Sequence, residues 1–400
     1  PENIYQTNSI KNNFIIAGLT FFTLIFLIKT IFYIFLIYMQ TNLKNNVIQS
    51  ISQKLYSGYL GLDYIFHTMR NSANLKQNII EETDVFSSVF NSILIIITES
   101  IILIFISLFL IFYNLEISTI IVTFLIAISY IILKLTKPKL TIWGSERLFH
   151  MEGRLKILQE GLDSIKEIYI LQKSMYFLNK FNSSLKNYLT ATRNYTVIHH
   201  ATRPTFEFVG ILSLVILLLV LIFKGNSTTY VVTTLGVFLA ASYRLLPSLY
   251  KIIQSIQNIK FHGVSIDRIL KEFKIINTQN KLVKSTTNIK FEENITFSGV
   301  DFVYPNKNQP ALNNINFSIN RGSKIGIKGA SGAGKSTLIN LILTLTKPTK
   351  GEIKVDNINL EQNNLSWLKN IGYVPQDVNL IDDSIEKNIA FGVKKEEIEM

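Results

Sequence analysis

Long apolar stretches, separated by polar segments, occupy roughly the first 250 residues of the chain. An apolar helix needs about 20 residues to cross a bilayer. The stretches are Phe14–Met39, Phe90–Tyr113, Ile117–Leu133, Phe208–Phe223 and Tyr230–Tyr243. The last one is short, and it reaches spanning length only by continuing through Arg244 to Tyr250. The pattern therefore predicts five membrane-spanning helices.

The basic residues indicate the side of each connection, because Lys and Arg are enriched in cytoplasmic loops. The short connections 114–116 and 224–229 contain only Lys224, whereas segments 40–86 and 134–203 are rich in Lys and Arg. We therefore expect both long segments, and the chain from residue 251 onward, in the cytoplasm. An odd number of helices then puts the chain's start outside. The simplest explanation is a fragment of a longer protein, with one more helix before residue 1.

Both long segments carry helical periodicity. In the second, apolar residues recur every three or four positions, at Leu155, Leu158, Leu162, Ile165, Ile168 and Leu171. The prediction is that membrane helices continue into the cytoplasm and turn back. The alternative is a separate inserted domain, but neither segment has strand patterning.

From about residue 288 the pattern changes to short β-rich runs between turn residues. The runs are Ile289–Phe291, Ile295–Phe297, Val300–Tyr304, Ile315–Ile319 and Lys324–Lys328, and a helix is expected at Ser336–Leu345. The alternation predicts a soluble α/β domain that opens with an antiparallel layer. The expected organisation is thus a helical membrane domain at 1–257, a polar connector at 258–287 and an α/β domain at 288–400.

Composition agrees with a membrane protein, since 48% of the 400 residues are hydrophobic and only 17% are charged. The formal charge of +12 could indicate nucleic acid, but in such an apolar chain it fits cytoplasmic loops near anionic lipid, and no nucleic-acid partner is expected. The absence of cysteine excludes disulfides and thiolate metal sites. The adjacent His199 and His200 point about 100° apart on a helix, which does not suit a metal site.

The segment Gly329–Thr337 reads Gly-Ala-Ser-Gly-Ala-Gly-Lys-Ser-Thr and fits the phosphate-binding pattern G-x-x-x-x-G-K-[ST]. Glycines let backbone N–H groups turn inward, and the helix N-terminus adds partial positive charge. Lys335 supplies a full charge to the β- and γ-phosphates, and the Ser336 hydroxyl is placed to bind Mg²⁺. The expected ATP-binding residues here are Gly329, Ser331, Gly332, Ala333, Gly334, Lys335, Ser336 and Thr337.

Further motifs follow the order found in ATP-binding-cassette (ABC) ATPases. Tyr304, about 25 residues before the P-loop, resembles the A-loop aromatic that stacks on adenine in that family; the alternative is a packed strand aromatic. Ile371–Gln376 resembles the Q-loop, and Asp383–Gly392 resembles the segment that follows it in exporters. By this resemblance Gln376 positions Mg²⁺ and the attacking water.

The resemblance implies an α-helical polytopic membrane domain followed by a partial α/β P-loop NTPase domain, the ABC exporter arrangement. It implies ATP and Mg²⁺ as cofactors, and a second copy or a homologous half-transporter as partner. Coupling helices would lie near Leu62–Asn74 and Glu160–Lys173. The signature, the Walker B residues with the general base and the switch histidine are expected beyond Met400, so this fragment is not expected to hydrolyse ATP alone.

Charged residues inside spans are costly and mark functional sites. Lys29 lies mid-span, Arg244 lies roughly 22 Å into its helix, and Lys251 follows about two turns later on the same face. These three cations suit a pyrophosphate-like headgroup in one cavity. Alternatively, Lys251 reaches the interface, and Lys29 and Arg244 pair with Glu99 or Glu207 as structural contacts. Pro247 is expected to kink its helix.

The stretch Tyr243–Ser248 with Lys251 also resembles the lipid-linked oligosaccharide flippase branch of ABC exporters, although Lys replaces Arg at two of the three basic positions, which implies looser headgroup contact. The first hypothesis is an ATP-driven flippase of the bacterial inner membrane that moves an anionic lipid-linked saccharide, surrounded by membrane lipid. The second is an exporter of drugs, peptides or other lipids without such a site. The third is a nucleotide-binding membrane regulator that transports nothing.

Overall fold

The computed structural model describes residues 2–279, 289–305, 307–360, 364–376, 378 and 380–397, with side chains from residue 15 onward except at 279, 364, 365 and 395. The chain divides into two compact units. One comprises Pro1–Leu62 with Phe66–Asn280, and the other comprises Asp63–Ile65 with Lys281–Met400. They are named here the helical unit and the sheet unit.

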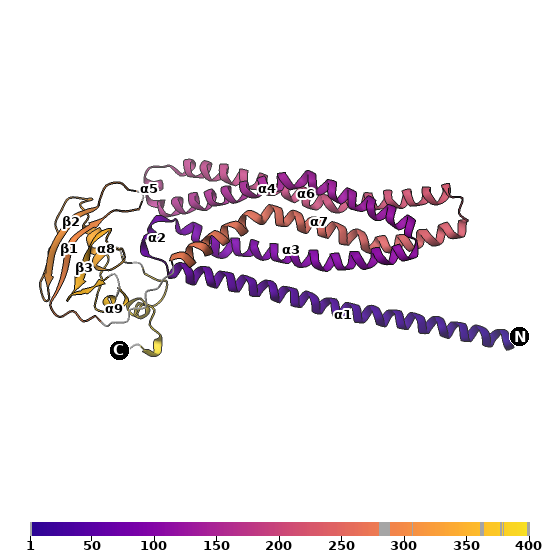
Figure 1. Ribbon diagram of the computed structural model, residues 1–400, viewed down its shortest axis with the longest axis horizontal. Coiled ribbons are helices and arrows are strands. Elements are labelled where there is room, and N and C mark those ends of the chain that lie inside the picture. The colour runs from indigo at the N-terminus through magenta and orange to yellow at the C-terminus, as the bar shows by residue number, and fades with distance from the viewer. Residues whose placement is uncertain are drawn as a thin grey trace. The chain divides into compact units, whose positions relative to one another are not determined.

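Within the described residues, the helical unit contains five helices long and apolar enough to cross a membrane, which confirms the prediction (Figure 1). They are α1 (Glu2–Leu60), α3 (Ser72–Tyr113), α4 (Leu115–Asp163), α6 (Ser174–Phe223) and α7 (Thr228–Gln279). Each has at least 42 residues, about twice what a bilayer requires. The helices thus continue through both long polar segments, as predicted.

Short helices mark the two places where the chain turns back. They are α2 (Tyr64–Met69), between α1 and α3, and α5 (Ile165–Ile170), between α4 and α6. Both lie inside the ranges expected for coupling helices. At the other end of the bundle, Asn114 ends α3 and begins α4, where its side chain accepts a hydrogen bond from the N–H of Ile117 at 3.1 Å. This satisfies an N–H group that a helix start leaves free.

The core of the helical unit lies among α3, α4, α6 and α7. It is built from large apolar side chains that include Leu110, Ile121, Phe206, Leu217 and Phe238. Close approach of α4 to α7 requires a glycine, because a Cβ at Gly144 would overlap the carbonyl oxygen of Phe261. Pro247 lies inside α7, as Pro138 does in α4 and Pro204 in α6.

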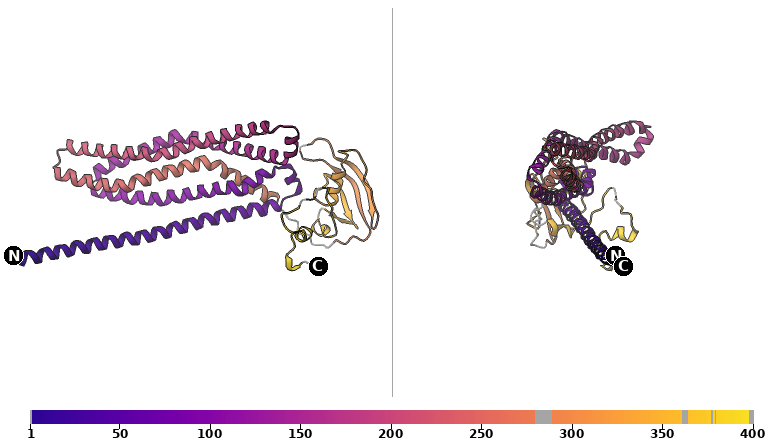
Figure 2. Two further views of the ribbon diagram at one scale, coloured as in Figure 1. Left: turned by 180° about the vertical axis from the view of Figure 1, so that it is seen from behind. Right: turned by 90° about the vertical axis from the view of Figure 1, so that its right-hand side faces the viewer.

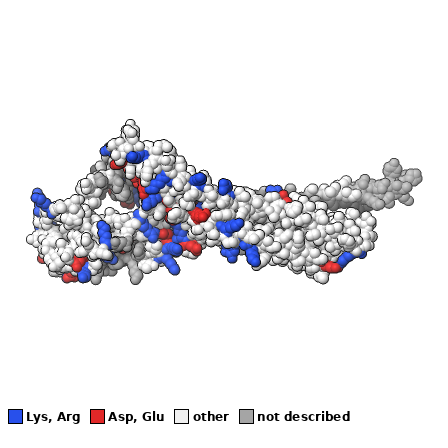
Figure 3. Space-filling view, turned by 90° about the horizontal axis from the view of Figure 1, so that it is seen from above, with Lys and Arg blue, Asp and Glu red and all other residues white. Residues whose placement is uncertain are grey.

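Helix α1 differs from the other four. It diverges from them toward its N-terminus in both views (Figure 2), and all its side chains from Ile15 to Met39 are exposed. Lipid is a favourable solvent for such an apolar helix, whose backbone groups bond internally. Charge is distributed along the bundle: side chains of one end are almost all uncharged except at its tip, and Lys, Arg, Asp and Glu gather along the rest (Figure 3).

The sheet unit begins with an antiparallel sheet in the order β2-β1-β3-β4. Its strands are β1 (Asn294–Phe302), β2 (Leu312–Asn320), β3 (Lys350–Val355) and β4 (Ile358–Asn359). The runs 295–297 and 300–304, expected as two strands, form one strand with an irregular register between Phe297 and Val300, where Gly299 has φ +57°. A glycine in the left-handed region is the usual centre of such a β-bulge.

Some expected elements differ. Ile289–Phe291 and Lys324–Lys328 are not strands, and in the second Ile325 and Ile327 are half exposed. A strand forms by pairing, and no described strand pairs with either segment. The helix expected at 336–345 is α8 (Lys335–Ile342). Most of the expected connector 258–287 belongs to α7, and residues 280–288 lie outside the description.

The remaining described elements are short. They are α9 (Asn364–Leu368), α10 (Ile385–Ile389) and the 3-10 helix η2 (Lys395–Glu397). Trp367 of α9 is buried in the core of the sheet unit, where its ring N–H donates to the carbonyl of Ile342 at 2.7 Å. This bond joins α9 to the end of α8, the helix that begins at the P-loop lysine.

Candidate functional site

The P-loop backbone turns through two left-handed glycines before α8 begins. Gly332 has φ +83° and Gly334, the N-cap of α8, has φ +86°. A Cβ on Gly334 would lie 2.5 Å from the carbonyl oxygen of Ala311 and 2.9 Å from a methyl carbon of Leu312. Both the φ angle and the space therefore require glycine at 334. The turn brings the loop to the start of β2 and ends at the N-terminus of α8.

Lys335 and Ser336 present the polar groups of this loop. The Lys335 ammonium donates to the carbonyl oxygens of Gly329 and Ala330, at 2.8 and 2.7 Å, so it lies across the loop that its own residue ends. Ser336 is exposed, and its hydroxyl makes no hydrogen bond within the described residues. A helix N-terminus, a full positive charge and a free hydroxyl are together the groups that a nucleotide phosphate with Mg²⁺ requires.

Tyr304 packs beside the P-loop helix. Its hydroxyl lies 3.1 Å from the Thr337 hydroxyl, and its ring meets Phe302 edge-on with centroids 4.8 Å apart. The residue is half-buried against the apolar core of the sheet unit. The geometry thus brings together Tyr304 and Thr337, two residues expected at the nucleotide site. Both the packed-aromatic interpretation and the adenine-stacking interpretation are compatible with a half-buried ring.

Gln376 is not joined to this group. It is exposed, and no hydrogen bond links it to the P-loop within the described residues. The segment after it forms α10, whose N-cap Ser384 accepts from the backbone N–H of Lys387 at 3.3 Å. The Lys387 ammonium bonds the Asp383 carboxylate at 2.8 Å and is the main cause that lowers the pKa of Asp383 below its ordinary value. The assigned role of Gln376 stays a prediction.

A second candidate site lies in the helical unit, where Glu99 of α3 meets three residues of α7. One Glu99 oxygen accepts from the Lys251 ammonium at 2.7 Å, and the other accepts from the Ser248 hydroxyl at 2.7 Å and lies 3.9 Å from the Arg244 guanidinium. Positions 244, 248 and 251 follow helical spacing on one face. Only 9% of the Glu99 side chain is exposed, against 43% for Arg244 and 34% for Lys251. The carboxylate therefore lies behind the two cations, which keep accessible faces.

The structure gives Lys29 a different environment. It lies on the exposed part of α1, its ammonium is 5.0 Å from the Phe26 ring centroid, and no described carboxylate pairs with it. Glu207, considered above as a partner, instead pairs with Arg203 one turn earlier at 2.8 Å. Arg244 and Lys251 are thus brought together and Lys29 is not joined to them. Ser248 was missed in the sequence, although its spacing from Arg244 and Lys251 could have indicated it.

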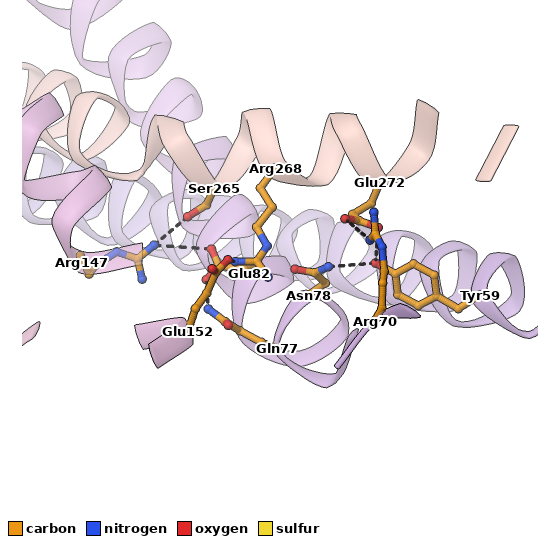
Figure 4. Close-up of polar contacts among 10 residues, drawn as sticks. All are labelled: Tyr59, Arg70, Gln77, Asn78, Glu82, Arg147, Glu152, Ser265, Arg268 and Glu272. Atoms are coloured by element: carbon orange, nitrogen blue, oxygen red, sulfur yellow. Dashed lines mark hydrogen bonds and ion pairs between the residues drawn. The ribbon is translucent and has the colours of Figure 1, made fainter. Parts of the chain in front are cut away.

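A buried polar network, also missed in the sequence, holds the other end of the bundle together (Figure 4). The fully buried Glu82 of α3 accepts from Gln77 at 3.0 Å and lies 3.5 Å from the guanidinium of Arg147 on α4. Arg147 also donates to the Ser265 hydroxyl of α7 at 2.7 Å. One carboxylate and one guanidinium thereby connect three helices.

A second group of polar contacts at this end of the bundle reaches α1. Glu272 of α7 accepts from Arg70 at 2.8 Å and from the Tyr59 hydroxyl at 3.1 Å, and the same hydroxyl accepts from Asn78 at 3.0 Å. Arg268 and Glu152 form a further ion pair between α7 and α4 (Figure 4). Buried charges of this kind are paired because an unpaired one is costly. The network positions the helices near α2 and leaves the α3–α7 cluster as a separate group.

Two family models match this chain. Residues 5–244 match the family described as ABC transporter transmembrane region, and residues 312–400 match the family described as ABC transporter. The ATP-dependent lipid A-core flippase of Wigglesworthia glossinidia brevipalpis is 26% identical over 353 residues, which are 87% of this chain and 60% of that protein. The flippase of the same name from Blochmanniella floridana is 25% identical over 350 residues, 86% of this chain and 59% of that one.

The fold agrees as well. The structure of a bacterial Atm1-family ABC exporter with ATP bound superposes with a TM-score of 0.75 at 18% identity, covering 89% of this chain and 63% of that one. This chain spans about 60% of the length of the flippases it matches.

The apolar helices and the transmembrane-region match, which covers more than half of the residues, agree with each other. The chain is a multi-pass membrane protein that belongs to the ABC transporter family.

Proposed function

We propose that the protein to which this chain belongs is an ATP-driven exporter or flippase, working as a dimer, that moves an anionic lipid-linked saccharide or a similar amphiphile across the membrane. The observation that carries the proposal is the Glu99–Arg244–Lys251 cluster in a chain that also holds a P-loop. A charged side chain inside the membrane is costly, and charged residues found there mark functional sites. The relatives named as lipid A-core flippases support a lipid substrate.

The charges of the cluster favour an anion. Two cations face one carboxylate, so the cluster in each chain keeps one net positive charge, and Arg244 and Lys251 are more exposed than Glu99. Arg can hold a phosphate with two parallel hydrogen bonds. Clusters from two chains would balance a doubly charged headgroup, and Lys29 would join them only if α1 packs against a further element.

At the nucleotide site, the P-loop amides and Lys335 would hold the phosphates, Ser336 would bind Mg²⁺, and Tyr304 would stack on the base. ATP with Mg²⁺ supplies the phosphoryl chemistry. Gln376 would orient the attacking water. This chain contributes two features to the site. The left-handed turn at Gly332 and Gly334 orients the backbone N–H groups of the loop, and the Lys335 ammonium extends back to the Gly329 carbonyl.

A second candidate, an exporter of other substrates without a lipid-phosphate site, is favoured by the same ion pairs interpreted as structural contacts. Glu99 already neutralises one of the two cations, at 2.7 Å from Lys251. In that case Arg244 and Lys251 stabilise the α3–α7 contact and select no substrate.

The test is ATP hydrolysis by the full-length protein in vesicles, with and without lipid-pyrophosphate saccharide. We expect stimulation in the wild type, loss of it in Arg244→Ala, and loss of all turnover in Lys335→Ala; Lys29→Ala should also lose stimulation if α1 packs so that Lys29 joins the cluster. Arg203→Ala is the matched control, because Arg203 is also paired with a glutamate, Glu207. Unchanged stimulation in both Arg244→Ala and Lys29→Ala would favour the second candidate, and turnover without any transport would favour a regulator.

A further inference from the structure

A cavity of about 410 Å³ lies between α4 and α7, away from the Glu99 cluster. Its wall on α4 follows one helical face, and its wall on α7 is formed by three residues within about one turn. The lining residues are Tyr130, Leu133, Lys134, Thr136, Lys137, Leu140, Ile256, Gln257 and Lys260. The volume lies in the range of small-molecule sites. The lining combines apolar side chains with three lysines and contains no acidic residue.

The ammonium groups of Lys134, Lys137 and Lys260 form no hydrogen bond or ion pair within the part of the chain that is described. The other polar lining groups are already engaged: the Gln257 amide bonds the Thr202 hydroxyl at 3.1 Å, and the Thr136 hydroxyl donates to the Ile132 carbonyl at 2.8 Å. Three uncompensated positive charges around one cavity call for an anion.

The position of the cavity identifies the kind of anion. Lys134 directly follows the apolar run that ends at Leu133, so the cavity lies where α4 leaves the hydrocarbon on the cytoplasmic side. On the membrane side its lining is Tyr130, 64% exposed, and Leu133. Lysines at such a boundary extend their charged ends toward lipid headgroups. A ligand here meets charge on one side and an apolar surface on the other.

We propose that this cavity binds an anionic phospholipid of the inner leaflet, with its phosphate held by Lys134, Lys137 and Lys260 and an acyl chain lying along Tyr130 and Leu133. Basic pockets between membrane helices on the cytoplasmic side are suited to such headgroups. The site differs from the Glu99 cluster, since Lys260 lies nine residues beyond Lys251, roughly 13 Å along α7. Because it bridges α4 and α7, bound lipid stabilises the contact between these helices.

The experiment compares the full-length protein in phosphatidylglycerol with the same protein in phosphatidylcholine. Thermal unfolding and native mass spectrometry measure stabilisation and retained lipid. We expect phosphatidylglycerol to raise the midpoint of unfolding and to be retained in the wild type. In the triple variant Lys134→Gln, Lys137→Gln, Lys260→Gln the affinity should fall by about tenfold or more.

Two matched variants separate this site from general surface charge. Lys139→Gln removes an exposed lysine on the same helix that does not line the cavity, and it should retain the lipid as the wild type does. Replacing the three lysines by Arg keeps the charge and should also retain lipid. Equal retention in the triple Gln variant, or an equal loss in Lys139→Gln, would overturn the proposal, as would equal stabilisation by inorganic phosphate. Lipid retention does not depend on ATP turnover or saccharide stimulation, so it is decided independently of the proposed transport function.

Discussion

The P-loop and the Glu99 cluster are both proposed to bind an anion, but the chain builds them in different ways. The P-loop is made by nine consecutive residues, and its geometry comes from backbone angles at Gly332 and Gly334. The cluster joins one residue of α3 to residues of α7 about 150 positions later. A sequence pattern can predict a site formed by consecutive backbone groups. A site formed by side chains of separate helices appears in the sequence only as isolated charged residues.

Gly334→Ala should give the largest effect, because it changes the backbone that makes the P-loop. The left-handed conformation costs a residue with a Cβ about 1–2 kcal/mol, and the added carbon would also crowd the Ala311 carbonyl oxygen at 2.5 Å. We expect ATP affinity, measured by fluorescent-nucleotide titration, to fall at least about tenfold.

Gly326→Ala is the control, since nothing lies within 4 Å of a Cβ there and its φ is not in the left-handed region. It should leave ATP affinity unchanged. Equal nucleotide affinity in Gly334→Ala and the wild type would show that the turn does not set the site.

The same contrast explains which parts of the fold could be predicted. The five long helices and the start of α8 follow from local periodicity and from the glycine-rich motif. The strand expected at Lys324–Lys328 failed although Ile325 and Ile327 alternate correctly, because a strand needs a hydrogen-bonded neighbour and none of the described strands pairs with it. Gly299, in turn, merges two expected strands into one by a bulge, since a glycine gives no local sign of which conformation it takes.

Breaking the ion pairs of the Glu99 cluster should have a smaller effect, on the free energy of unfolding, and the pair with Lys251 should contribute more than the pair with Arg244. In a double-mutant cycle, Glu99→Gln with Lys251→Gln should give a coupling of about 1 kcal/mol, because the charged atoms are 2.7 Å apart. The cycle with Arg244→Gln should give less, since that pair is separated by 3.9 Å. Equilibrium unfolding in mixed detergent micelles measures both.

The control for this order is the cycle of Arg203 with Glu207, an exposed pair on a single helix, which should give the least. A larger coupling for Arg244 than for Lys251 would contradict the geometry. The charged residues themselves were visible in the sequence, but their pairing was not, because no local pattern says which helix faces which. The same reason hid the buried network of Glu82, Arg147 and Glu272.

Asp356 combines a local turn, as in the P-loop, with contacts to distant residues, as in the Glu99 cluster. Its replacement should have the smallest effect of the three, and that effect is on the stability of the sheet unit. Its turn is local: Asp356 and Asn357 both have positive φ, the geometry of a two-residue hairpin. Its hydrogen bonds are distant, since its carboxylate accepts from the backbone N–H groups of Glu292, Glu293 and Asn294. Although slight desolvation raises the pKa of Asp356, these bonds outweigh it and lower the pKa below its ordinary value.

A lowered pKa in the folded state means that the charged form of Asp356 stabilises the fold. That stabilisation is complete above the ordinary pKa of about 3.9 and is lost as the pH falls through the lower folded value. We therefore expect Asp356→Asn to reduce the unfolding midpoint at pH 7, and the difference from the wild type to vanish at low pH. Fluorescence of the buried Trp367, in a Trp143→Phe background, follows the unfolding of this unit alone. Asp382→Asn is the control, because Asp382 is exposed and makes no hydrogen bond in the described chain, and its unfolding midpoint should equal that of the wild type at every pH. If the midpoint of Asp356→Asn instead stayed below that of the wild type by the same amount at every pH, the turn conformation and not the distant hydrogen bonds would carry the effect.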